Sequence, residues 1–271
     1  MFFVLAAVML PALSAQTYRP SPNYVAGGKA DQAEGARILG EFRQTGIAGT
    51  YWLEFELRVL LRKGDGQTVK GRMLGTRGDH GPLTRLDVED QRWLIQSGPA
   101  PAAWRGIDGV AARTMSAKET MQPVAGTDLT IFDLQMPFLQ WTDFVYEGLA
   151  RMRGRPAHSF VLYPPADPAA ARHGLTGVRV LLDTQFQTLV SAELLGAKGA
   201  TEKSITILDL KKMGGQWLVK SIDLRNHVTR DKTRFTVTMA ALDLALPEET
   251  FAPAALAADA PAVPPEKIQR F

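Results

Sequence analysis

The chain has 271 residues, of which 45% are hydrophobic and 22% charged, and its formal net charge is +3. This composition is typical of a globular protein, and the small, evenly spread charge argues against nucleic acid as a partner. Because the chain has no cysteine, disulfides, cysteine-ligated zinc, thiol nucleophiles and a lipid anchor on cysteine are excluded.

The first 15 residues have the pattern of a secretory signal peptide. Residues 2–13 form an apolar run that is too short to cross a bilayer, and small residues follow it. The run lacks the Lys or Arg that usually precedes it in a signal sequence. A buried N-terminal strand or helix is the alternative reading of these residues. We expect residues 1–15 to be removed on export, residues 16–27 to form a flexible leader, and the mature protein to be soluble.

Residues 31–43 are expected to form the first helix, since apolar side chains recur on one helical face. These are Gly35, Ile38, Leu39 and Phe42. Asp31 caps the start of this helix, with Glu34 three residues later.

A long strand follows, because apolar and charged residues alternate from residue 51 to residue 62. The apolar set is Tyr51, Leu53, Phe55, Leu57, Val59 and Leu61, and it alternates with Trp52, Glu54, Glu56, Arg58, Leu60 and Arg62. A turn at 63–66 predicts a hairpin with a partner strand at 68–76. We expect Glu54, Glu56 and Arg58 to face water.

Many further strands are expected at short spacing. They lie near 84–89, 92–96, 143–152, 157–163, 177–183, 188–195, 202–211, 216–225 and 232–242, and a turn at 108–109 joins two short strands. The Ala/Pro-rich tail at 252–271 is expected to be disordered. With no linker in between, residues 28–251 are predicted to form one mainly β (α+β) domain, a large curved antiparallel sheet or unclosed β-barrel. We expect the helix at 31–43 to pack across its concave face.

One segment, from Leu129 to Trp141, interrupts the strands and is apolar on more than one side. A short helix is predicted at 130–139, with Thr130 as its cap and a bend or end at Pro137. Either the apolar side chains fill the curved sheet as an ordinary core, or the sheet leaves a cavity for a hydrophobic ligand.

The search for catalytic chemistry finds no motif. The four histidines form no metal-binding pair, and the chain has no nucleophile elbow, P-loop or dinucleotide fingerprint. The carboxylate pair Glu54 and Glu56 lies on the expected solvent face of a strand. We therefore expect no enzymatic activity, no cofactor and no metal site.

The order of elements and a series of short motifs resemble the outer-membrane lipoprotein-sorting (LolA-like) family, and an uncharacterised branch of it in particular. The likeness covers about residues 30–251. The motifs are Gly126-Thr127-Asp128-Leu129-Thr130, Asp133-Leu134, Phe138, Trp141, Tyr146-Glu147-Gly148, Gly154-Arg155-Pro156, Tyr163-Pro164-Pro165, Leu182-Asp183, Gln216-Trp217 and Thr233-Arg234-Phe235.

This resemblance implies an unclosed β-barrel whose helices lie over the concave side as a lid. It implies a periplasmic, monomeric carrier that binds a lipoprotein acyl chain or another lipid and meets a membrane-associated donor or acceptor protein. The expected cavity residues are Leu53, Phe55, Leu57 and Val59, and the expected lid residues are Ile131, Phe132, Leu134, Phe138 and Trp141. Arg85 is the nearest counterpart of the strand arginine that holds the lid in such carriers, and an exposed strand arginine is the alternative reading.

Two other functions stay open at this point. The same fold could serve as an envelope sensor or interaction module that binds a lipoprotein or peptide and contacts a membrane partner. An enzyme would need polar groups that converge inside the cavity, which the sequence does not reveal. A fixed plug, never displaced by ligand, is the alternative to a mobile lid.

Overall fold

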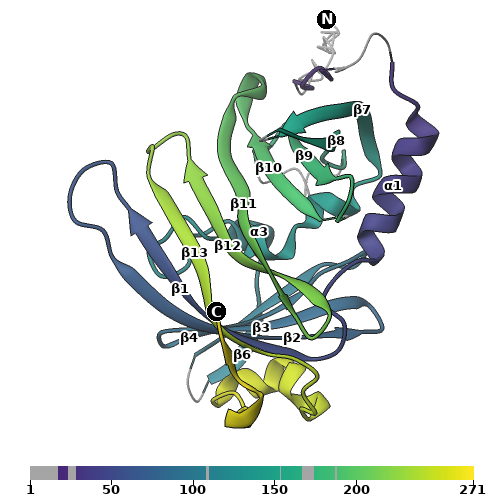
Figure 1. Ribbon diagram of the computed structural model, residues 1–271. Helices are drawn as coiled ribbons and strands as arrows, with labels where there is room; N and C mark the ends of the chain where they lie inside the picture. Colours follow the sequence, from purple (N-terminus) through teal and green to yellow (C-terminus); the bar gives the residue numbers. More distant parts are fainter. Residues whose placement is uncertain (1–17, 24–28, 108–109, 153, 167–173, 187) are drawn as a thin grey trace, which may run out of the picture.

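A strongly curved antiparallel sheet dominates the computed structural model (Figure 1). The structure describes residues 18–23, 29–107, 110–152, 154–166, 174–186 and 188–271. The strands are β1 (Tyr51–Leu60), β2 (Thr68–Gly78), β3 (Gly81–Val88), β4 (Gln91–Gln96), β5 (Ala102–Ile107), β6 (Val110–Thr114), β7 (Asp143–Met152), β8 (Arg155–Tyr163), β9 (Gly177–Asp183), β10 (Leu189–Leu195), β11 (Thr201–Met213), β12 (Gln216–Asn226), β13 (Lys232–Ala241) and β14 (Gln269–Arg270). The helices are α1 (Gln32–Gln44), α2 (Ala117–Thr120) and α3 (Ile131–Gln135), with 3-10 turns η1 (Pro137–Gln140), η3 (Ala197–Gly199), η4 (Glu248–Phe251), η5 (Pro253–Ala257) and η6 (Pro265–Lys267).

The strand order leaves the sheet open. In the described part of the chain the order is β6-β5-β4-β3-β2-β1-β13-β12-β11-β10-β9-β8-β7, and β14 adds to β13. The two ends of this path, β6 and β7, are the free edges of the sheet. The prediction of a mainly β, unclosed antiparallel sheet is confirmed. Among the helices that the structure describes, none combines the length and the hydropathy needed to cross a bilayer.

Strand β1 shows how the sequence sets the two faces of the sheet. Leu53, Phe55 and Leu57 are buried in the main apolar cluster, while Arg58 on the opposite face is exposed. A one-residue slip would bury the charges, so the alternation fixes the register. Glu54 and Glu56 are half-buried on the outer face rather than fully in water.

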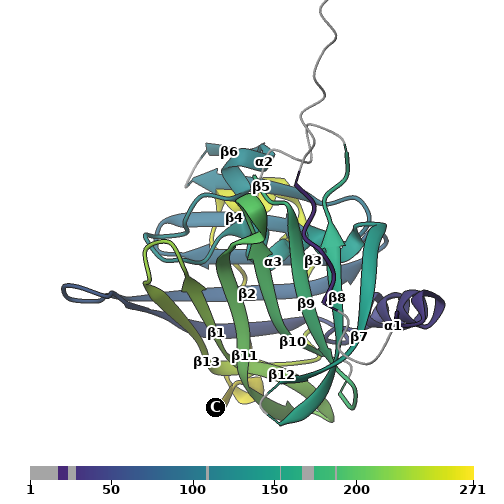
Figure 2. The same cartoon turned by 90° about the horizontal axis from the view of Figure 1, so that it is seen from above.

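The segment between β6 and β7, residues 115–142, lies on the concave side of the sheet, and we call it the plug. Figure 2 shows α3 behind the strands of the sheet, inside its curve. The predicted helix at 130–139 is broken into α3 and η1, because Met136 adopts left-handed backbone angles (φ 46°, ψ 51°) directly before Pro137. Thr130 caps α3 as predicted, with Asp133 completing a capping box.

Helix α1 packs at the β7 edge of the sheet. Its N-cap is Asp31, as predicted, and it contributes Leu39 to the main apolar cluster. Gly35 permits this close approach, since a Cβ at this position would lie 2.4 Å from the Cβ of Tyr146 in β7. The expected helix is therefore present, but it lies beside the edge strand rather than across the middle of the concave face.

The C-terminal segment is ordered, which corrects the prediction of a disordered tail at 252–271. Residues 244–271, which we call the strap, cross the outer face of the sheet and bury Leu256 completely. A Cβ at Gly106 would lie 2.5 Å from the Cβ of Leu256, so a glycine is needed there. The strap also covers Trp52 and Leu74, which face away from the main cluster.

Part of the predicted flexible leader also has a defined place. Residues 18–23 lie against β8 and β9, and Pro20 is buried. The predicted signal peptide at 1–15 and the turn at 108–109 lie outside the described residues.

Candidate ligand-binding site

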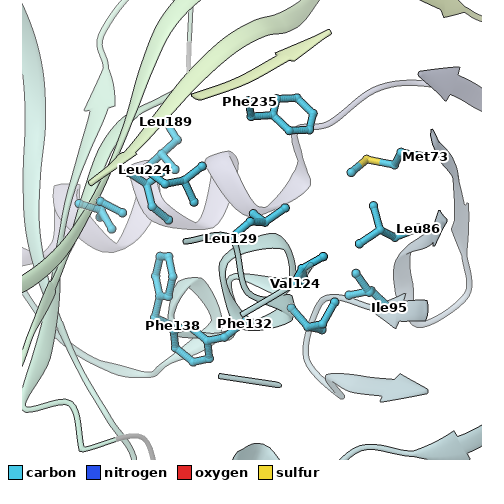
Figure 3. Packing of buried hydrophobic residues seen from close by; sticks show 14 of the residues in the cluster. Met73, Leu86, Ile95, Val124, Leu129, Phe132, Phe138, Leu189, Leu224 and Phe235 are labelled. Carbon is cyan, nitrogen blue, oxygen red and sulfur yellow. The ribbon is translucent and has the colours of Figure 1, made fainter. Parts of the chain in front are cut away.

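The concave face of the sheet is the candidate site, and here it is filled by its own side chains. The expected cavity residues Leu53, Phe55, Leu57 and Val59 are all buried. The ring of Phe55 stacks on that of Phe235 with centroids 4.7 Å apart. Figure 3 shows the plug and the surrounding strands meeting in one cluster. Its labelled members are Met73, Leu86, Ile95, Val124, Leu129, Phe132, Phe138, Leu189, Leu224 and Phe235.

The expected lid residues are the part of the plug that enters this cluster. Phe132 and Phe138 are fully buried, and their rings lie 5.9 Å apart. Ile131 and Trp141 are also buried, while Leu134 is half-buried against the same cluster. The plug therefore supplies apolar surface to the concave face, as the pattern of residues 129–141 predicts.

Polar contacts fasten the α3 end of the plug. Lys203 of β11 donates hydrogen bonds to the Asp133 carboxylate and to the carbonyl of Asp128. The Lys203 side chain is 14% exposed and that of Asp133 only 1%, so this is a buried ion pair. The hydroxyl of Thr233 donates to Asp128 at 3.0 Å, and Gln135 donates to the carbonyls of 96 and 102.

The η1 end of the plug is held differently. Arg43, at the end of α1, donates to the carbonyls of Leu139 (2.6 Å) and Trp141 (3.0 Å). Burial lowers the pKa of its guanidinium from the usual value. Met136, between α3 and η1, has a backbone conformation that non-glycine residues seldom adopt. Met136 thus separates two differently held parts of the plug. In α3 the Asp133 side chain forms an ion pair, whereas η1 is held through the carbonyls of Leu139 and Trp141.

Clefts flank η1. One of about 450 Å³ lies between η1, the end of α1 and the β2–β3 turn, and His80 and Leu139 are among its lining residues. Another, of about 410 Å³, lies between the start of β5 and the η1 end of the plug, and Ala103, Met115 and Trp141 are among its lining residues. The second cleft is apolar in character and leads from the surface to the plug.

A separate cleft of about 350 Å³ lies away from the plug, between the β9–β10 turn and the start of β12. Phe186 and Trp217 line it, with ring centroids 5.5 Å apart. Arg155 lies over the Phe186 ring, 4.9 Å from its centroid. No sequence pattern indicates this cleft, because Phe186 lies in the β9–β10 turn and Trp217 lies at the start of β12, 31 positions later.

The prediction that Arg85 latches the lid is wrong, and so is the alternative of an exposed arginine. Arg85 is 1% exposed and points to the outer face, where it donates to the carbonyls of Ala255 (3.1 Å) and Ala258 (2.6 Å) in the strap. Its guanidinium also pairs with Asp87 at 3.0 Å. Since Leu86 faces the core, its neighbour Arg85 must face the opposite side. Contacts to the plug come instead from Lys203 at the α3 end and from Arg43 at the η1 end.

In the residues that the structure describes, no three His, Asp or Glu side chains gather as a metal site would require. His158 shares a hydrogen bond with the Tyr146 hydroxyl (2.9 Å), and burial lowers the pKa of its imidazole. This pair lies beside α1, near Glu34 and Arg37, and its hydrogen bond joins β7 to β8.

Known structures share this architecture. A domain from Vibrio parahaemolyticus, described as an outer membrane lipoprotein-sorting protein, is 19% identical with a TM-score of 0.73, over 84% of this chain and 100% of that one. A DUF1329 family protein from Desulfovibrio piger is 14% identical with a TM-score of 0.72, over 83% and 98%. A LolA superfamily protein from Nitrosomonas europaea is 12% identical with a TM-score of 0.61, over 80% and 96%.

The structural similarity, at TM-scores of 0.61 to 0.73, shows the fold, which is the LolA-like fold that the motifs indicate. No curated protein matches the sequence of this chain. A family model described as that of an uncharacterised protein matches residues 111–258, just over half of the chain, including the plug, the strands β7 to β13 and the start of the strap. The chain therefore belongs to this uncharacterised family, and it has the LolA-like fold.

Proposed function

We propose that this protein is a periplasmic carrier that holds a lipoprotein acyl chain, or a similar hydrophobic ligand, against the concave face of the sheet. One observation carries the proposal. The sheet is unclosed, and much of the apolar surface on its concave face comes from a separate segment, the plug, which connects the two end strands β6 and β7. An acyl chain offers the same kind of surface as Phe138 and Trp141, which are buried at the η1 end of the plug.

When a ligand displaces η1, the free energy gained by burying the acyl chain offsets the free energy lost by exposing plug side chains. Opening η1 would expose apolar side chains, while each acyl CH₂ removed from water contributes about 0.8 kcal/mol. A long acyl chain therefore compensates for the lost contacts of a few plug side chains. The cleft beside Met115 and Trp141 gives the ligand a way to reach the concave face. The same balance allows release to a membrane-associated acceptor.

In this proposal, η1 moves and α3 stays. Asp133 of α3 is held by a buried ion pair, whereas η1 is held through the carbonyls of Leu139 and Trp141. Left-handed Met136 and Pro137 form the joint between the two parts. A mobile lid, rather than a fixed plug, is the expected behaviour of residues 137–141.

Hydrogen exchange with and without a triacylated lipopeptide tests this behaviour. In the free protein we expect the amides of 138–141 to exchange faster than those of β8 or β11, because local opening exposes them. The lipopeptide should slow that exchange, because binding stabilises the bound arrangement by mass action. A water-soluble peptide of the same sequence without acyl chains is the matched control. Strong, equal protection in all three samples would leave a fixed plug and refute a carrier that works through η1.

A further inference from the structure

The outer face of β7, β8 and β9 carries polar side chains that the acyl-binding proposal does not use. We call this surface the groove, because residues 18–23 lie along it; its side chains are Asp143, Glu147, Ser159, Tyr163 and Arg179. In β8, Phe160 and Leu162 face the main cluster, so Ser159, Val161 and Tyr163 face outward. Figure 2 shows the purple N-terminal segment running alongside β8 and β9. Residues 18–23 occupy this groove.

Specific contacts hold Arg19 and Pro20 in the groove. The Arg19 guanidinium donates two hydrogen bonds to the Asp143 carboxylate, at 2.6 and 2.8 Å. It also lies 3.6 Å from the centroid of the Tyr163 ring, which adds a cation–π contact. The Tyr163 hydroxyl donates to the carbonyl of Pro20 at 2.7 Å. The groove thus recognises both a guanidinium and the main chain that follows it.

A buried carboxylate forms the other end of the groove. Glu147 is 1% exposed, and its Oε1 accepts the N–H of Asn23 at 2.6 Å. Its Oε2 accepts from the Ser159 hydroxyl at 2.5 Å and from Arg179 at 3.4 Å. Arg179 and Ser159 belong to the sheet, so two partners of the Glu147 carboxylate come from outside the leader.

The occupant itself is held weakly. Of the six described leader residues only Pro20 is buried, and the side chains of Arg19 and Asp143 are about half exposed, at 53% and 51%. Exposed ion pairs of this kind strengthen binding about fivefold at most. Pro20 and Pro22 favour an extended main chain, which reduces the entropy lost on docking. A groove with a loosely held, extended occupant has the properties of a site that exchanges peptides.

We propose that this groove is a binding site for an extended peptide in which an arginine is followed by proline, and that the chain's own residues 18–23 occupy it until a partner protein's segment of this chemistry replaces them. Asp143 and Tyr163 select the arginine. Tyr163 and Glu147 bind the peptide's main chain, at the carbonyl and the N–H that Pro20 and Asn23 supply in the leader.

The test uses a fluorescent peptide, Tyr-Arg-Pro-Ser-Pro-Asn, and the full-length protein with Arg19→Ala, read by fluorescence anisotropy. In the unsubstituted protein the leader competes at an effective concentration on the order of millimolar. For a peptide Kd of about 100 μM, we therefore expect binding to Arg19→Ala to be about tenfold tighter than to the unsubstituted protein. Adding Asp143→Asn to Arg19→Ala should weaken peptide binding about fivefold.

Two controls make the result specific. Arg37→Ala removes another exposed, ion-paired arginine, in α1, and should leave the affinity as in the unsubstituted protein. A peptide with alanine in place of its arginine should not bind. No binding to an Arg19→Ala protein with unchanged thermal unfolding would overturn the proposal, as would equal binding of the arginine and alanine peptides. No lipid is present, so this outcome is independent of the acyl-binding proposal.

Discussion

Replacing Phe55 by alanine is expected to lower the free energy of unfolding by about 3–5 kcal/mol. Phe55 is fully buried, stacks on Phe235 and lies at the centre of the concave face. The plug closes over this face, so the space left by the ring cannot fill with solvent or collapse freely. Urea unfolding of the ligand-free protein, followed by tryptophan fluorescence, measures the change.

Glu56→Ala is the matched control, because Glu56 is the next residue of β1 and points to the other face. Its side chain is 40% exposed and pairs with Lys70 at 3.6 Å, so we expect a loss below about 1 kcal/mol. Equal, small losses for both variants would mean that Phe55 lines an empty pocket rather than a filled core.

Replacing Lys203 by methionine is expected to destabilise the protein by about 3 kcal/mol, because Asp133 is left as a buried charge without a cation. The Thr130 main-chain N–H and hydroxyl still donate to Asp133, at 2.8 and 2.7 Å, but they carry no charge. The Oδ1 atom of Asp133 accepts no hydrogen bond within the described structure, so it offers no compensation. Thermal unfolding measures the loss, and hydrogen exchange at α3 should rise with it.

The double variant Lys203→Met with Asp133→Asn distinguishes charge from packing. Asparagine keeps an oxygen that can cap α3 while it removes the charge, so the double variant should recover much of the lost stability. If the double variant is as unstable as Lys203→Met alone, the ion pair does not fasten the plug and Lys203 acts only through its aliphatic chain.

Local patterns predicted much of the sheet, because apolar and polar residues alternate along a strand that has one buried face. Residues 51–61 alternate, and β1 lies where this alternation predicts. Asp31 and Thr130 cap their helices as expected, since capping depends on residues only three positions apart. Met136 was not expected to be left-handed, because nothing in its side chain indicates it.

Contacts between distant residues escaped prediction. The partner of Asp133 is 70 positions away, and Lys203 is one of several lysines in the second half of the chain. Trp52 was assigned to the polar face of β1, yet it is buried, because the strap covers that face. The strap itself looked disordered by composition, although it is held by Arg85 from the sheet.

Arg85 shows how a resemblance can conflict with a local pattern. The likeness to lipoprotein carriers suggested a latch on the concave side, whereas the alternation of residues 84–89 places Arg85 opposite Leu86. Leu86 is in the main cluster, and Arg85 contacts the strap on the outer face. The local pattern was the better guide, because strand geometry leaves no choice of face once one neighbour is buried.

Photolabelling with a lipopeptide that carries a diazirine in its acyl chain tests the central claim most directly. If the acyl chain lies on the concave face, peptide mapping will find the label on plug and strand residues of that face, such as Leu57, Phe138 and Phe235. An excess of unlabelled lipopeptide should suppress this labelling. Label confined to the cleft of Phe186 and Trp217, or to the outer face, would contradict the account.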